Sequence, residues 1–199
     1  MRIKFFLAGL IIVLAAVLTY QFVPENVVTY PPGMLVSDVP LQTELTTSKV
    51  WGIGDYQITA LSGFRLKARV LHRKKYSSGH ESDLSPIDLA FGWRELSDQN
   101  VIDKIDFDQH GRWYFWKTKH YPVPKRVIET NSANMHMIPA DDDISETLTN
   151  IQVGQIVQIS GFLVAIKATD GWKWHSSLSR EDTGSGACEI VWVEKIAVE

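Results

Sequence analysis

The sequence predicts a mainly β domain with short helices, of the α+β class, and three observations lead to this prediction. Residues 64–70 alternate apolar and basic side chains, which is the period-two pattern of a strand with one buried face. Residues 156–166 are apolar on both faces, as expected of a central strand. Residues 188–196 alternate again and close the chain as a last strand. Strands therefore dominate, and the helical signals between them are short.

The N-terminus predicts a membrane anchor over residues 1–23. Arg2 and Lys4 precede an apolar run over residues 5–23, close to the roughly 20 residues that span a bilayer core. Small-x-small cleavage sites are poor here, so a retained anchor is favoured over a cleaved signal peptide, with both left open. Because positive charges stay in the cytoplasm, we expect a single-pass inner-membrane protein with a cytoplasmic N-terminus and a periplasmic domain.

Residues 24–54 are rich in proline and lack periodicity, which predicts an extended stalk, and a single β-rich domain is expected over residues 55–199. Within this domain Ser85 and Pro86, with Asp88 in a first turn, predict a short helix that Gly92 interrupts. The other elements follow from period and capping signals: a strand over 56–70, a loop over 72–83, a helix over 97–105, an aromatic strand over 111–119, a helix over 141–151, a strand over 156–166, a hairpin partner over 172–175 and a strand over 188–196.

The order of these elements favours a small, partly open, OB-like barrel behind the N-terminal transmembrane helix. Gly161 lets the central strand bend around a barrel corner, and the turn at residues 169–171 returns the chain as a hairpin. A helix-decorated sandwich is the second choice.

Composition excludes several function classes. The chain carries 20 Lys and Arg against 23 Asp and Glu, without the positive excess that nucleic-acid binding requires. Its only cysteine, Cys188, forms no intramolecular disulfide and is interpreted as a small buried hydrophobe. The histidines lack metal-ligand spacing and no glycine-rich phosphate loop is present, so neither a metal nor a cofactor is expected.

Polar side chains concentrate in two segments that are predicted as loops, and two tryptophans follow a turn. Residues 131–140 and 176–186 join neighbouring elements and offer hydrogen-bonding groups, although local backbone bonding explains much of their polarity. Trp172 and Trp174 lie on one face of a strand, as a stacking platform or as a half-buried wall. The ligand-binding candidates are Asn131, Ser132, Asn134, His136, Trp172, Trp174, Arg180 and Asp182.

The sequence contains no complete catalytic motif, which favours a non-catalytic protein over an enzyme and leaves both open. A nucleophile elbow of the form Gly-x-Ser-x-Gly is absent, and Asp182-Thr183-Gly184 lacks the second copy that an aspartic protease needs. The catalytic candidates are His136 combined with Asp182 or Cys188. The enzyme hypothesis is a small hydrolase or transferase that uses these residues.

Three stretches carry a resemblance to a family: residues 85–93, residues 132–140 and residues 172–189. They resemble an uncharacterised family of bacterial membrane-anchored (conserved hypothetical) proteins, which implies a setting in the bacterial envelope. The leading hypothesis is a membrane-anchored periplasmic binding or assembly module without a complete catalytic site. Alternatives are the small hydrolase or transferase, and a structural subunit with a protein partner in the envelope.

Overall fold

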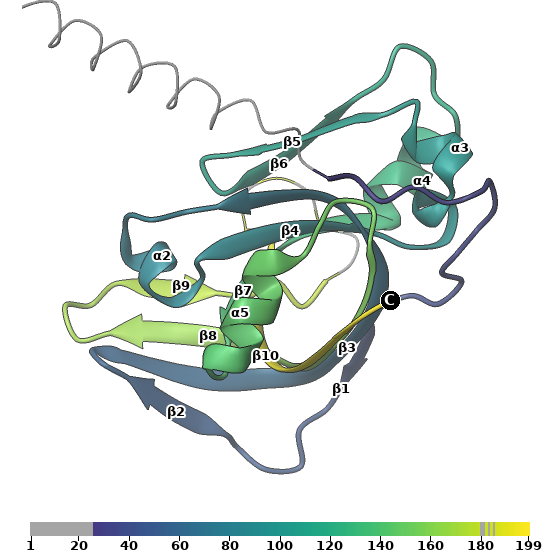
Figure 1. Cartoon of the computed structure of the whole chain (residues 1–199). Helices are drawn as coiled ribbons and strands as arrows, with labels where there is room; N and C mark the ends of the chain where they lie inside the picture. Colours follow the sequence, from purple (N-terminus) through teal and green to yellow (C-terminus); the bar gives the residue numbers. More distant parts are fainter. Residues whose placement is uncertain (1–25, 180–181, 183, 185) are drawn as a thin grey trace, which may run out of the picture.

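The computed structural model describes residues 26–179, 182, 184 and 186–199, and its architecture is mainly β with few short helices (Figure 1). The strands are β1 (Leu41–Thr43), β2 (Val50–Ile53), β3 (Tyr56–Lys75), β4 (Ile87–Gly92), β5 (Asp106–His110), β6 (Trp113–Lys117), β7 (Ser132–Pro139), β8 (Ile156–Ala168), β9 (Lys173–His175) and β10 (Glu189–Val198). The helical segments are α2 (His80–Leu84), the 3-10 turn η1 (Arg94–Ser97), α3 (Gln99–Ile102), α4 (Lys125–Thr130) and α5 (Asp142–Asn150).

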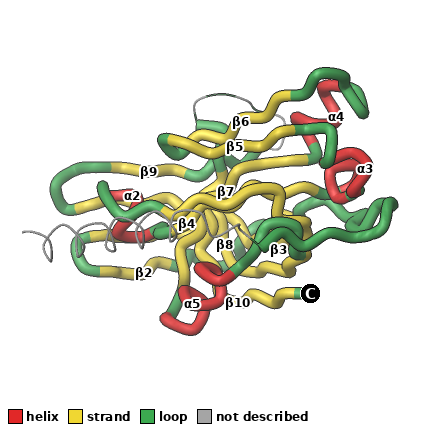
Figure 2. Tube along the Cα trace, turned by 45° about the horizontal axis from the view of Figure 1, so that its top comes forward, coloured by secondary structure: helices red, strands yellow, loops and turns green. Residues whose placement is uncertain are grey.

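A ring of hydrogen-bonded strands organises the fold. Strand β3 pairs with β4, β4 with β7, β7 with β10 and β10 with β8, and β8 pairs again with β3. All of these pairs are antiparallel except β7–β10, which is parallel. Strands β1 and β2 extend the sheet on β3, and β9 extends it on β8, while β5 and β6 form a separate hairpin (Figure 2).

Strand β3 pairs with both of its neighbours in the ring because it is long and bends. Its first part pairs with β8 and its last part with β4, and the register shifts between Ala60 and Ser62 and again between Val70 and His72. Such bulges increase the local twist and turn a strand toward a new partner. At Gly161 the backbones of β8 and β10 approach each other closely. A Cβ at this position would collide with the backbone of Trp192 in β10.

The apolar core fills the inside of this ring. Inward side chains of β3, β4, β7, β8 and β10 form one cluster, and Leu148 and Ile151 from α5 and its C-cap join it. A second cluster covers the outer face of β8 and β10, where Trp51 stacks on Trp192 with ring centroids 5.0 Å apart. Strand β8 therefore buries both faces, as its sequence predicts. Each fully buried Leu or Ile contributes about 1.5–3 kcal/mol to such a core.

Several predicted elements are confirmed by the structure. The predicted aromatic strand over 111–119 is β6, and the predicted hairpin partner over 172–175 is β9, which pairs with β8. The predicted helix over 141–151 is α5, and the Asp141 side chain caps it by accepting a hydrogen bond from the Ile144 amide at 2.8 Å.

Three segments of the domain differ from the prediction. The loop expected over 72–83 contains the last residues of β3, up to Lys75, and most of helix α2. The helix expected after Ser85 is strand β4, all of whose residues are buried between β3 and β7. Pairing on both edges outweighs the local capping signal there. The loop expected over 131–140 is largely strand β7, with apolar residues on its inner face and polar residues on its outer face.

The described part of the predicted stalk packs against the domain instead of standing clear of it. Val28 donates its amide to Val153 O at 2.8 Å, Val36 is buried in the core, and β1 and β2 pair with β3. The predicted anchor over residues 5–23 lies outside the described residues. Among the residues that the structure describes, no helix is long and apolar enough to cross a bilayer.

Candidate functional site

The polar face of β7 is the starting point of the candidate site. Ala133, Met135 and Met137 face the apolar core, so Ser132, Asn134 and His136 share the opposite face of the strand. In the β4–β7 register Asp88 lies opposite His136, and Ala90 lies opposite Asn134. The parallel register pairs Glu189 with Met135, which brings Cys188 next to Asn134. Although this face points outward, Asn134, His136 and Asp88 are buried.

A buried ion pair joins β4 to β7. Asp88 is 0% exposed and His136 is 3% exposed, and His136 Nδ1 lies 2.9 Å from Asp88 Oδ1, off the line of a well-directed hydrogen bond. Burial by itself lowers the pKa of His136, but the contacts with Asp88 and Cys188 outweigh burial and raise this pKa from 6.5 to about 9. The imidazolium is therefore the favoured form at neutral pH. The Trp174 ring packs over His136 at 4.7 Å between centroids.

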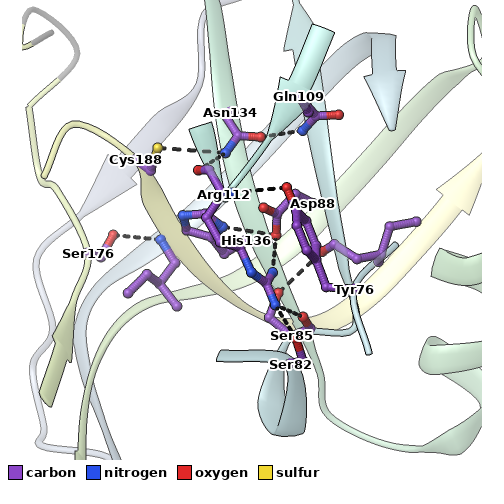
Figure 3. Close-up of polar contacts among 12 residues, drawn as sticks. Tyr76, Ser82, Ser85, Asp88, Gln109, Arg112, Asn134, His136, Ser176 and Cys188 are labelled. Carbon is purple, nitrogen blue, oxygen red and sulfur yellow. Dashed lines mark hydrogen bonds and ion pairs between the residues drawn. The ribbon is translucent and has the colours of Figure 1, made fainter. Parts of the chain in front are cut away.

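Arg112 closes the other side of Asp88. Its Nη1 donates to Asp88 Oδ1 at 2.6 Å, and its Nη2 donates to Ser82 Oγ and to Ser85 O, each at 2.9 Å (Figure 3). The guanidinium also lies 3.9 Å from the centre of the Tyr76 ring. Arg112 and Gly111 both have positive φ, which suits the two-residue turn between β5 and β6. The hairpin is thus anchored at its tip by a partly buried arginine.

A second polar chain runs beside the first. Gln109 Nε2 donates to Asn134 Oδ1, and Gln109 Oε1 lies 2.9 Å from His72 Nδ1. Asn134 Nδ2 then lies 3.6 Å from Cys188 Sγ and 3.4 Å from Arg112 O (Figure 3). Gln109 is 1% exposed, so the orientation of the Asn134 amide is fixed in the interior.

Both chains end beside a pocket of about 210 Å³. Its described lining is aromatic on one side, from Trp93 and the β6 hairpin, and polar on the other, from β7 and the segment before β10. The residues are Trp93, Trp113, Tyr114, Trp116, Glu129, Ser132, Ala133, Asn134, Ser179, Asp182, Gly184, Ala187, Cys188 and Glu189. Trp93 is 1% exposed, and its indole Nε1 has no hydrogen-bond partner among the described residues.

The site residues predicted from the sequence fall into two groups, one at this pocket and one elsewhere in the fold. Ser132, Asn134, Asp182 and Cys188 line the pocket. His136 is on the same face of β7 as Asn134 and is not among the lining residues. Asp182 accepts a hydrogen bond from Ser177 Oγ at 2.6 Å. Side chains from both polar segments singled out in the sequence, 131–140 and 176–186, thus line this pocket.

The other candidates lie elsewhere. Asn131 donates to Glu95 at 2.7 Å, Trp172 stacks on His80 at 5.1 Å, and Trp174 packs against His136 and the second apolar cluster. Arg180 lies outside the described residues. The described parts of the chain contain no group of three His, Cys, Asp or Glu side chains that could hold a metal ion.

Sequence reasoning missed Asp88, Gln109, Arg112 and the tryptophans of the pocket wall. Asp88 carried a misleading signal, because Ser85-Pro86 before it is typical of a helix start. The alternation of polar and apolar residues over 132–137 was a usable signal for β7.

Comparisons of the chain with models of known families, with curated proteins and with solved structures give no match. The chemistry of the pocket is therefore the basis for a functional conclusion.

Proposed function

We propose that this chain is a membrane-anchored binding module of the bacterial envelope, and that the pocket between β6, β7 and the segment before β10 holds its ligand. The observation that carries the proposal is Trp93, which lines the pocket and whose buried indole N–H has no partner among the described residues. An unpaired buried donor costs about 1–3 kcal/mol, a cost that a ligand acceptor removes. A structural role alone gives no reason for this cost.

The order of strands around the ring supports an OB-like, partly open barrel as the scaffold. The five ring strands follow one another along the chain as β3, β4, β7, β8 and β10. Around the ring they pair in the cyclic order β3-β4-β7-β10-β8, so the last two strands exchange places. Helix α5 lies between β7 and β8 in sequence and contacts β7 and β10. OB-folds are five-stranded Greek-key barrels that bind ligands on a strand face and the adjoining loops. The pocket occupies such a place, at the polar face of β7.

The chemistry of the lining favours a ligand with a flat ring and a positively charged group. Aromatic faces attract cations, and the described lining holds three carboxylates, Glu129, Asp182 and Glu189, and no Lys or Arg. One of them, Glu129, also pairs with the exposed Lys125 at 3.0 Å. A nucleic-acid ligand is disfavoured because its phosphates meet the same carboxylates.

The proposed location rests on the apolar run over residues 5–23 and on Arg2 and Lys4 before it. These features support a single-pass anchor in the inner membrane with the domain in the periplasm. A protein partner in the envelope stays a prediction, and capture of the anchored chain from membranes tests it.

A pair of probes with opposite charge tests the binding proposal. Benzylammonium and benzoate have similar shapes, so a calorimetric titration of the full chain in detergent separates charge from size. We expect saturable binding of benzylammonium and none of benzoate.

Replacing Trp113 with Ala removes part of the pocket wall and is expected to abolish binding. Phe115→Ala is the matched control, because Phe115 is on the same strand, stacks on His110 at 4.1 Å and does not line the pocket. Binding that is equal for both probes, or that survives Trp113→Ala unchanged, contradicts the proposal.

A further inference from the structure

Cys188 occupies an unusual position for a structural cysteine. It belongs to none of the described apolar clusters, is only partly buried, and lines the pocket. Sγ lies 3.6 Å from the Asn134 amide nitrogen, and His136, two residues further along the same face of β7, is close enough to interact with the thiol. A cysteine that serves only to fill a core is surrounded by apolar groups. The surroundings of Cys188 are those of a reactive thiol instead.

His136 is held in an orientation that suits proton transfer with this thiol. Its Nδ1 faces Asp88, 2.9 Å away, which leaves Nε2 for the thiol. Asp88 is itself held by Arg112 at 2.6 Å, so the carboxylate cannot turn away (Figure 3). A nucleophile, a base beside it and a third group that orients the base form the arrangement that acyl-transfer enzymes share.

The ionic groups of this cluster also favour proton exchange between Cys188 and His136. Asp88 carries one negative charge and contacts two cationic partners, Arg112 and the imidazolium of His136. The two cations leave this ion-paired group with one positive charge, which favours a negative charge at Sγ against the opposing effect of the buried Glu189 at the next position. The position next to His136, on the pocket side, is that of Cys188.

We propose that Cys188 is the nucleophile of an acyl-transfer site for small esters and thioesters, with His136 as the group that moves the proton and Asp88 as its positioning residue. The proposal rests on the proposed function only in that the same pocket admits the substrate. It replaces Asp182, the carboxylate that the sequence suggests for this role, with Asp88.

The reaction proceeds in two balanced steps. First, with the thiol proton already on His136 Nε2, the Sγ thiolate attacks the carbonyl carbon; the bond to the leaving oxygen or sulfur breaks, and the leaving group takes the proton from His136. A thioester on Cys188 results. Second, a water molecule gives a proton to His136 while its oxygen attacks the thioester carbon; the C–S bond breaks, and Sγ leaves as the thiolate beside the imidazolium of His136. The products are the carboxylic acid, the alcohol or thiol, and the free enzyme.

Asn134 is placed to assist the first step. Its Nδ2 lies next to Sγ, and Gln109 holds the other side of the amide. A fixed amide N–H beside the attacking atom can donate to the oxygen on which negative charge develops. Trp93, whose buried indole N–H has no partner among the described residues, lines the same pocket.

Acetylation by p-nitrophenyl acetate tests the proposal on the full chain in detergent. Release of p-nitrophenolate gives the rate, and peptide mass spectrometry locates the acetyl group. We expect acetylation of Cys188 at pH 7, none at this position in Cys188→Ser, and a rate about 10²-fold lower in His136→Gln. His80→Gln is the matched control, because His80 lies on α2 beside Tyr56 and Trp172 rather than at the pocket. Its rate is expected to equal that of the unchanged chain.

A measurement on the unchanged chain avoids variants that fail to fold. The acetylation rate of Cys188 in the native protein is compared with the rate in the same chain unfolded in urea, where His136 and Asp88 no longer act on the thiol. We expect the native rate to be about 10²-fold higher. A native rate equal to or below the unfolded rate overturns the proposal.

Asp88→Asn separates a positioning role from a merely structural one. We expect the acetylation rate constant to fall while the half-saturating ester concentration stays unchanged. A change in the half-saturating concentration alone contradicts the assigned role. Benzylammonium binding is measured in Cys188→Ser in parallel, so that loss of acetylation with binding retained refutes only this inference.

Discussion

Removal of the Arg112 guanidinium is expected to destabilise the fold more than any other single change at the hairpin. In Arg112→Met the aliphatic part of the side chain stays, while the 2.6 Å contact to Asp88, the bonds to Ser82 and Ser85 and the stacking on Tyr76 are lost. Asp88 is 0% exposed, so its carboxylate cannot recover solvation from water. Removing one partner of a buried ion pair costs about 3–5 kcal/mol when the other charge is left unpaired. Asp88 keeps its contact with His136 at 2.9 Å, so the expected loss is at the lower end of this range, about 3 kcal/mol.

The expected loss corresponds to a decrease in Tm on the order of 10 °C for a domain of this size. Urea unfolding of the full chain in detergent, followed by tryptophan fluorescence, measures the free energy of unfolding. Arg94→Met is the matched control, because Arg94 also has a positive φ, 49° against 68° for Arg112, but its side chain is exposed. A loss at Arg112 no larger than at Arg94 refutes the argument that the buried ion pair anchors the hairpin.

Three further stability predictions follow from single contacts. Folding raises the pKa of His136 from 6.5 to about 9, so the contribution of its protonation to stability is fully present below pH 6.5 and is lost as the pH rises through 9. Between pH 6 and pH 9.5, urea unfolding is expected to show a loss of about 3 kcal/mol in the free energy of unfolding, and His136→Gln is expected not to show this loss. Gly161→Ala places a Cβ against the backbone of β10 and is expected to cost about 1–3 kcal/mol in urea unfolding, whereas Gly52→Ala, in open space, leaves stability nearly unchanged. Asp141→Ala removes the α5 cap and is expected to cost about 1 kcal/mol by thermal unfolding. Asp143→Ala, in the first turn of the helix and without a capping bond, is expected to have the smaller effect.

The sequence predicts the strands whose burial is visible in their own pattern. Strand β8 is apolar on both faces over 156–166, and it is the strand that lies between two apolar clusters. The helix at 141–151 carries its own cap in Asp141. In these segments local pattern and tertiary position agree, so a single chain is enough to find them.

The candidate site depends on pairings that local pattern does not encode. Asp88 looks like an acid in a helical first turn, but the β4–β7 register places it beside His136. Arg112 lies in a turn, where an arginine is ordinarily solvated, and only the fold of the hairpin brings it to Asp88. Cys188 looks like a core residue until the parallel β7–β10 register places it at a pocket. Long-range register decides all three.

Tryptophan indole signals in a nitrogen–proton NMR spectrum of the full chain in detergent test the ligand pocket most directly. On addition of benzylammonium, the account predicts that the indole signals of Trp93, Trp113 and Trp116 shift together, because these residues line the pocket. The signals of Trp51 and Trp192, which stack on each other in the second apolar cluster, stay in place. Shifts at Trp51 and Trp192 with none at Trp93 contradict the account.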